Sequence, residues 1–215
     1  MDSIHNLTGM ASAVVAITAS LMLVSGMERL GRSWIIILMS AIVIAALVPL
    51  DGLPVAAYVR SAIGDVSITT IVLLGRGLLR PLFGWPPVAA RTRVVLHALI
   101  ALTAATLYPL ALGIGPFDPY RLGYGDLWFM GGLLALALAT WLARLPLIAL
   151  CIAFAVLAWT VGWYESNNLW DYLLDPLVSL YALYAIIRCG VKTLRGPHGA
   201  DRADRDLHRT VTPGS

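Results

Sequence analysis

Three ionisable side chains lie within long apolar stretches of the sequence, where a charge needs a reason to be present. Arg60 and Asp65 fall within residues 55–74, and Asp175 falls within residues 171–187. A charged side chain at the centre of a hydrocarbon layer costs at least ~2.5 kcal/mol, so it normally faces other protein or a water-filled cavity. Such residues relay protons or ions, or they join helices to one another. Arg60, Asp65 and Asp175 are therefore candidate intramembrane polar residues.

The spacing of these charges predicts how they pair. On one continuous helix, Arg60 and Asp65 would point about 140° apart and would be poorly placed to pair. Arg60 and Asp175 enter from the same side to a similar depth, so we predict an Arg60–Asp175 ion pair between two helices. Asp171 lies four residues before Asp175, on the same face of a predicted helix. Asp65 is left without a predicted cation, and two roles stay open for it: part of a structural polar cluster, or a group that handles protons or ions.

A second set of candidate residues falls in two long polar connections, residues 113–128 and 163–171. Each connection combines carboxylates with aromatic rings, and the first is rich in turn-forming Gly and Pro. Two interpretations remain: a solvated acidic rim, or a surface that binds a cation, an amine or a protein partner. The candidate binding residues are Asp118, Tyr120, Arg121, Asp126, Glu165, Asn168, Trp170 and Asp171.

The elements that must position these residues are apolar helices. Of the 215 residues, 59% are hydrophobic and 13% are charged, about half the charged share of a soluble domain. Seven apolar runs, each near the ~20 residues that cross a bilayer as a helix, cover residues 8–27, 33–50, 55–74, 94–115, 127–143, 145–163 and 171–187. We therefore predict an all-α, polytopic transmembrane bundle of seven spans in residues 1–192. A polar tail, residues 193–215, follows it.

Basic residues give the predicted bundle its orientation. All of them except Arg60 and Arg121 fall in connections on one side or in the C-terminal tail. Basic loops remain on the cytoplasmic side, so the N-terminus is expected outside and the C-terminus inside. This arrangement predicts a multi-pass protein of a bacterial-type inner membrane, with the lipid bilayer as solvent and the two polar connections on the outer face.

One short motif resembles a known catalytic family. Gly123, Tyr124, Gly125 and Asp126 form a G-x-G-D sequence, and Asp65 is a second membrane aspartate upstream. This pattern resembles the intramembrane aspartyl proteases of the prepilin-peptidase and presenilin type. The resemblance implies that Asp65 and Asp126 would share the acid and base work. The predicted topology departs from the family, because it places Asp126 outside, whereas those enzymes act from the cytoplasmic side.

Other features exclude several classes of function. The sequence has no P-loop, nucleophile elbow, H-E-x-x-H or C-x-x-C motif, so we assign no catalytic residue. His97 is the one histidine in a predicted span, and we expect no metal and no cofactor. The basic residues punctuate apolar runs, which argues against nucleic-acid binding. The favoured function is a non-enzymatic membrane subunit or scaffold whose outer loops dock a membrane or periplasmic protein or an envelope component. The alternative is a small transporter or channel that uses Arg60, Asp65 and Asp175.

Overall fold

The computed structural model describes residues 2–24, 26 and 31–195, and these residues are mostly helical. The all-α prediction is confirmed. The elements are α1 (Asp2–Val24), α2 (Arg32–Leu47), the short antiparallel pair β1 (Pro49–Leu50) and β2 (Leu53–Pro54), α3 (Val55–Ile63), α4 (Ile68–Phe83), α5 (Ala90–Ala111), the 3-10 helix η2 (Pro119–Tyr124), α6 (Leu127–Leu142), α7 (Pro146–Thr160), α8 (Leu169–Leu173) and α9 (Pro176–Arg195). The predicted domain boundary at residue 192 falls inside α9. Residues 196–215 of the predicted tail lie outside the described residues.

Two of the helices predicted as continuous are interrupted. The run 55–74 divides into α3 and α4 because Gly64 adopts φ 77°, a left-handed conformation that glycine reaches without a steric penalty. The run 171–187 divides into α8 and α9 at Leu174 and Asp175, and Pro176 begins the second helix. The prediction that Asp171 and Asp175 share one helix face is therefore wrong, because α8 ends between them.

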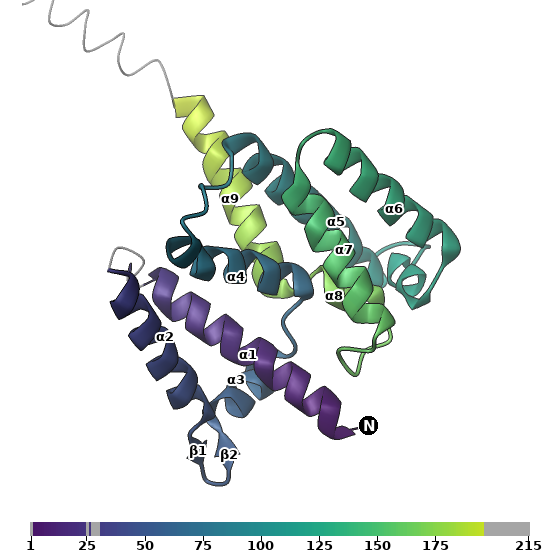
Figure 1. Cartoon of the computed structure of the whole chain (residues 1–215). Helices are drawn as coiled ribbons and strands as arrows, with labels where there is room; N and C mark the ends of the chain where they lie inside the picture. Colours follow the sequence, from purple (N-terminus) through teal and green to yellow (C-terminus); the bar gives the residue numbers. More distant parts are fainter. Residues whose placement is uncertain (1, 25, 27–30, 196–215) are drawn as a thin grey trace, which may run out of the picture.

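The helices pack around one main core and two smaller ones. Buried apolar side chains of α4, α5, α7, α8 and α9 form the main cluster, in which Leu169, Tyr172, Ala155 and Ala182 are inaccessible to solvent. α5 lies along α9, and α7 lies between α6 and α8 (Figure 1). α1 packs on α2, α3 and α4, with Ala13 and Ala19 buried at these contacts.

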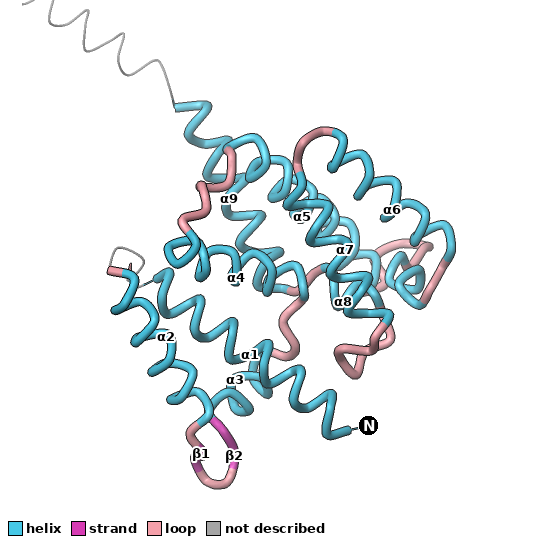
Figure 2. Tube along the Cα trace, viewed as in Figure 1, coloured by secondary structure: helices cyan, strands magenta, loops and turns pink. Residues whose placement is uncertain are grey.

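The connections gather at two ends of the bundle. In Figure 2, the start of α2 and the α4–α5 and α6–α7 connections lie along one edge, whereas the β1–β2 turn and the α7–α8 connection lie at the opposite edge. The consecutive apolar helices therefore run up and down between these edges. This arrangement places η2 and the α7–α8 connection close together.

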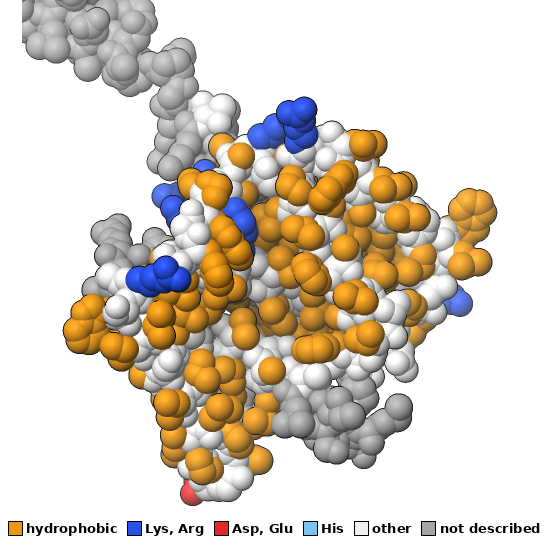
Figure 3. Space-filling view, in the orientation of Figure 1, with side chains coloured by type: hydrophobic (Ala, Val, Ile, Leu, Met, Phe, Trp, Pro, Cys, Tyr) orange, Lys and Arg blue, Asp and Glu red, His pale blue; other side chains and the backbone are white. Residues whose placement is uncertain are grey.

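Much of the surface is apolar. Leu112, Leu127, Trp128 and Leu142 are each at least 80% exposed, and hydrophobic side chains are spread over much of the face seen in Figure 3. Among the described residues, one helix, Ala90–Ala111, is long and apolar enough to cross a membrane. Shorter apolar helices cover Thr8–Met22, Arg32–Leu47, Leu127–Leu142, Pro146–Thr160 and Pro176–Val191. A seven-span bundle therefore stays a prediction.

Candidate functional site

Asp175 lies where the two helix interruptions meet. Its Oδ2 atom accepts hydrogen bonds from the Ser67 backbone N–H at 2.9 Å, from Ser67 Oγ at 2.7 Å and from Thr70 Oγ1 at 2.5 Å. Its Oδ1 atom accepts one from the Val178 backbone N–H at 2.8 Å. Asp175 is 5% exposed. One buried carboxylate thus receives hydrogen bonds at the starts of both α4 and α9.

The local sequence explains this arrangement. Free backbone N–H groups at a helix start need acceptors, and Asp and Ser are preferred there. Asp175 precedes α9, and Pro176 follows at a position where no N–H is required. Ser67 precedes α4, and its hydroxyl accepts a hydrogen bond from the Thr70 backbone N–H. Because a buried carboxylate is costly unless hydrogen-bonded, the donors at the start of α4 stabilise Asp175 where it lies.

Arg60 pairs with Asp65, not with Asp175. Arg60 Nε lies 2.6 Å from Asp65 Oδ1, and Nη2 lies 3.2 Å from Oδ2, which makes a two-pronged ion pair. The predicted Arg60–Asp175 pair is therefore wrong, and so is the expectation that Asp65 lacks a cation. Both errors have one cause: α3 ends at Ile63, so the chain turns at Gly64 and brings Asp65 back toward Arg60. The carboxylate of Glu165 lies 4.0 Å from the same guanidinium.

Gly9 of α1 makes room for this ion pair. A Cβ atom at Gly9 would collide with the guanidinium group of Arg60. The Arg60 side chain is 17% exposed, and that of Asp65 is 27% exposed. The pair therefore lies partly buried against the backbone of α1, and it joins α1 to the α3–α4 interruption.

Tyr164 connects the same interruption to the α7–α8 connection. Its hydroxyl donates to the Val66 carbonyl oxygen at 2.6 Å and lies 3.0 Å from Ser12 Oγ on α1. The fully buried Tyr172 accepts a hydrogen bond from the Tyr164 backbone N–H at 3.0 Å. Burial raises the pKa of Tyr164 well above its ordinary value, so this phenol remains a donor at neutral pH.

The two polar connections are bonded to each other in what we call the outer cap: η2 together with residues 163–171. Tyr120 Oη donates to the Asp171 carboxylate, 2.8 Å from Oδ1. Asn168 Nδ2 donates to the Tyr120 carbonyl at 2.9 Å, and Trp170 Nε1 donates to the Pro119 carbonyl at 3.0 Å. Burial, with a further contribution from the hydrogen bond to Asp171, raises the pKa of Tyr120 well above its ordinary value.

Close packing at Gly123 completes the cap. A Cβ atom at Gly123 would collide with the Asn168 side chain and press on Trp170. Asn168 is 1% exposed, and its Oδ1 accepts a hydrogen bond from the Trp170 backbone N–H at 3.0 Å. Ser166 Oγ donates to Asp171 at 2.5 Å. Five side chains therefore form hydrogen bonds within the cap: Tyr120, Ser166, Asn168, Trp170 and Asp171.

The remaining predicted site residues divide into caps and exposed charges. Asp118 accepts a hydrogen bond from the Tyr120 backbone N–H at 2.9 Å and caps η2. Asp126 accepts one from the Phe129 backbone N–H at 2.9 Å and caps α6. Arg121 and Glu165 are exposed. Asp65 and Asp126, the two aspartates of the protease-like pattern, thus have separate structural partners.

Several residues of the site escaped sequence reasoning. Ser67, Thr70 and Tyr164 are ordinary polar residues in an apolar sequence, and their partners are about 100 residues distant along the chain. The signals that could have found them are Gly64 beside Asp65 and Pro176 beside Asp175, since both residues interrupt helices. Within the part of the chain that the structure describes, no group of three His, Cys, Asp or Glu side chains could hold a metal ion.

Comparison with known proteins found no matching family model, and no curated protein or solved structure similar to the chain.

Proposed function

We propose that this protein is a multi-pass inner-membrane protein in which α3–α4 and α8–α9 each count as one interrupted span. Seven crossings then place the N-terminus outside and the C-terminus in the cytoplasm. The exposed apolar side chains support this proposal (Figure 3), because lipid removes the cost of exposing them. The gathering of alternate connections at opposite edges supports it as well.

Within that membrane we propose a non-enzymatic role, as a subunit or scaffold whose outer cap docks a membrane or periplasmic protein or an envelope component. The observation that carries the proposal is the linkage of the two cap segments through Tyr120–Asp171, Asn168–Tyr120 and Trp170–Pro119. A surface held rigid before binding loses less conformational entropy when it binds. The cap therefore has the character of a preformed docking surface.

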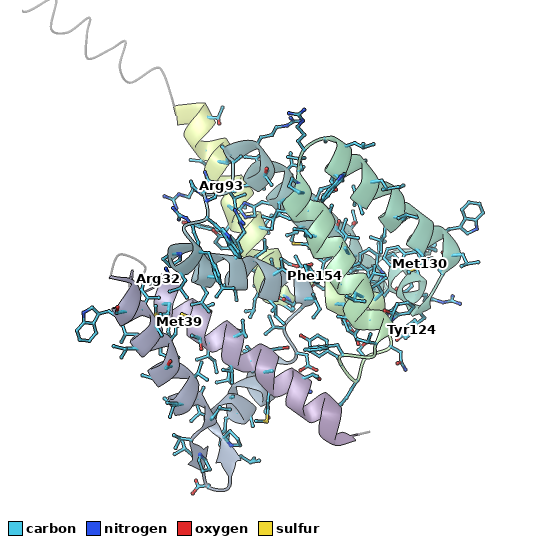
Figure 4. All side chains as sticks on the ribbon, in the orientation of Figure 1. Arg32, Met39, Arg93, Tyr124, Met130 and Phe154 are labelled. Carbon is cyan, nitrogen blue, oxygen red and sulfur yellow. The ribbon has the colours of Figure 1, made fainter. Side chains whose placement is uncertain are left out.

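The side chains around the cap suit such a surface. Tyr124 is 62% exposed, Trp128 is 90% exposed and Phe117 is 57% exposed. The exposed Arg121 belongs to the same segment, and the exposed Glu165 belongs to the other segment of the cap. Tyr, Trp and Arg are enriched among the few residues that contribute most of the binding energy in protein interfaces. Figure 4 shows Tyr124 and Met130 on the same side of the molecule, beside the start of α6.

Photocrosslinking tests this function. A benzophenone amino acid placed at Tyr124 or Trp128 in native membranes is expected to give one discrete crosslinked product. The same probe at Trp34, which is 62% exposed on α2, is the control and should give none. The product should also disappear in the Tyr120→Phe, Trp170→Phe variant, in which two links of the cap are lost. Equal labelling from all three positions would rule out a specific docking surface.

One observation favours transport as a second candidate function. Two interrupted helices cross at the buried Asp175 carboxylate, and interrupted helices often form the ion sites of secondary transporters. Against this candidate, Asp175 already receives four hydrogen bonds from its own chain. Tracer flux in proteoliposomes distinguishes the two. A flux in the wild type that is abolished in a folded Asp175→Asn variant would favour transport over the scaffold role.

A further inference from the structure

The turn between α4 and α5 carries positive charge that forms no ion pair with a described carboxylate. It is flanked by Arg76 and Arg80 at the end of α4 and by Arg91 and Arg93 at the start of α5, and the sequence from 66 to 117 contains no acidic residue. Among the described residues, both ion pairs belong to Arg60. None of the four arginines therefore forms an ion pair with a described carboxylate. Arg80, Arg91 and Arg93 are exposed, and Arg76 is half-buried.

Arg76 lies in α4, about two turns before its end, and its side chain is held in a defined position against the α4–α5 turn. Its Nη2 atom donates to the Pro86 carbonyl oxygen at 3.1 Å, and its Cζ atom lies 5.7 Å from the centroid of the Trp85 ring. The Trp85 ring stacks on Phe83, with the ring centroids 5.2 Å apart. A guanidinium has five N–H donors in a fixed plane, so most of those of Arg76 remain available to a ligand.

The aromatic rings place this guanidinium beside apolar surface. Phe83 is 61% exposed and Trp85 is 39% exposed, and tryptophan is enriched where headgroups meet hydrocarbon. In Figure 3 the basic side chains follow the edge to which the α4–α5 turn belongs, next to hydrophobic side chains, and Figure 4 labels Arg32 and Arg93 along this edge. A ligand that suits this edge has an anionic head that accepts planar, paired hydrogen bonds and an apolar body.

We propose that the α4–α5 turn binds the phosphodiester headgroup of an anionic glycerophospholipid, with Arg76 as its central contact. The proposal rests on the cytoplasmic orientation proposed above, since anionic lipids are concentrated in that leaflet. Guanidinium groups pair with phosphate through two parallel hydrogen bonds. Arg80, Arg91 and Arg93 add attraction around the headgroup, and Phe83 and Trp85 contact the upper part of the acyl chains.

Native mass spectrometry of the full chain in detergent micelles tests the proposal. Dioleoylphosphatidylglycerol is expected to bind more tightly than dioleoylphosphatidylcholine. R76Q should weaken binding of the anionic lipid about fivefold, the typical contribution of one basic residue near an anionic surface, and it should leave binding of the zwitterionic lipid unchanged. Trp85→Leu keeps the net charge but removes the ring beneath Arg76, and it should also weaken binding of the anionic lipid.

The matched control is R144Q, which removes the same charge from the exposed α6–α7 turn, and it should keep the preference for phosphatidylglycerol. If R144Q weakened lipid binding as much as R76Q, or if Trp85→Leu had no effect, net charge alone would explain the binding of the anionic lipid. Either result would overturn the site. Equal affinity of the wild type for both lipids would overturn it too. If the protein instead stays monodisperse in buffer without detergent, the proposed membrane residence itself fails.

Discussion

The Asp175 carboxylate, at the break between α8 and α9, lies 2.7 Å from the Ser67 hydroxyl, at the break between α3 and α4. The two helix interruptions are therefore hydrogen-bonded to each other. Each interruption frees backbone groups that a continuous helix would use internally. Asp175 accepts from the freed donors, and Tyr164 donates to the freed Val66 carbonyl. The backbone groups freed at the α3–α4 interruption therefore find hydrogen-bond partners in a distant part of the chain.

Replacing Asp175 is expected to destabilise the fold strongly. Asp175→Ala leaves the buried donors of Ser67, Thr70 and Val178 without an acceptor, and we expect the free energy of unfolding to fall by about 3 kcal/mol or more. Asp175→Asn keeps one acceptor oxygen and should cost less. Thermal unfolding in detergent measures both. The exposed Arg121→Gln is the control; an Asp175→Ala variant no less stable than this control would refute the role of Asp175.

The contact between Gly9 and Arg60 predicts that the effect of Gly9→Ala on stability depends on the side chain at position 60. Gly9→Ala places a methyl group against the Arg60 guanidinium and should cost about 1–3 kcal/mol through overpacking. In an Arg60→Ala background the same change should cost little, and this non-additivity is the measured quantity.

Gly131→Ala is the matched control for Gly9→Ala. Gly131 also lies in a helix, but a Cβ there meets no atom within 4 Å. Alanine should therefore stabilise α6 by about 0.5–1 kcal/mol. A Gly9→Ala variant that is stabilised to the same extent would show that α1 and Arg60 do not touch.

Tyr120 gives the outer cap a dependence on alkaline pH. Its folded-state pKa lies above its value in the unfolded chain, about 10. The unfolded state therefore loses this proton first as the pH rises. The contribution of Tyr120 to stability is complete below pH ~10 and is lost at higher pH. Tyr120→Phe should lower the free energy of unfolding by about 1–2 kcal/mol at neutral pH, and the difference from wild type should shrink above pH ~10 in thermal unfolding. A difference independent of pH would contradict this.

Cysteine labelling tests the proposed orientation. In a background carrying Cys151→Ala and Cys189→Ala, a cysteine at Asn167 should react with a membrane-impermeant maleimide added to intact spheroplasts. A cysteine at Ala89, which precedes α5, should react only after the membrane is permeabilised. Both positions are exposed, so accessibility within the fold does not limit either reaction. Labelling of Ala89→Cys in intact spheroplasts would show that the proposed topology is wrong.

The helical segments were predictable because hydrophobic runs and helix-ending residues are local properties of the sequence. The predicted run 94–115 and α5, for example, share most of their residues. The charge pairing was not predictable by the same means. It depended on the direction of the chain after Gly64, and one left-handed residue changed the partner of Arg60 from Asp175 to Asp65.

In the outer cap, too, the sequence indicated which residues matter but not how they are bonded. Composition singled out Tyr120, Asn168, Trp170 and Asp171, and the structure joins all four. Their bonding pattern depends on the close approach at Gly123, which no periodic pattern reports. Asp118 and Asp126, which the sequence predicts as binding residues, each accept a hydrogen bond at the start of the helix that follows. Their positions before Pro119 and before an apolar run also indicate this capping role.

The hydrogen bond between Asp175 and Ser67 can form only late in biosynthesis. The two residues are 108 positions apart in the chain, so a ribosome that adds about 5–20 residues per second needs roughly 5–20 s to make the second after the first. Throughout that interval the nascent α3–α4 segment carries polar groups that have not yet met their acceptor. In the proposed membrane location, we expect an insertion factor or retained water to solvate these polar groups until residue 175 has been made.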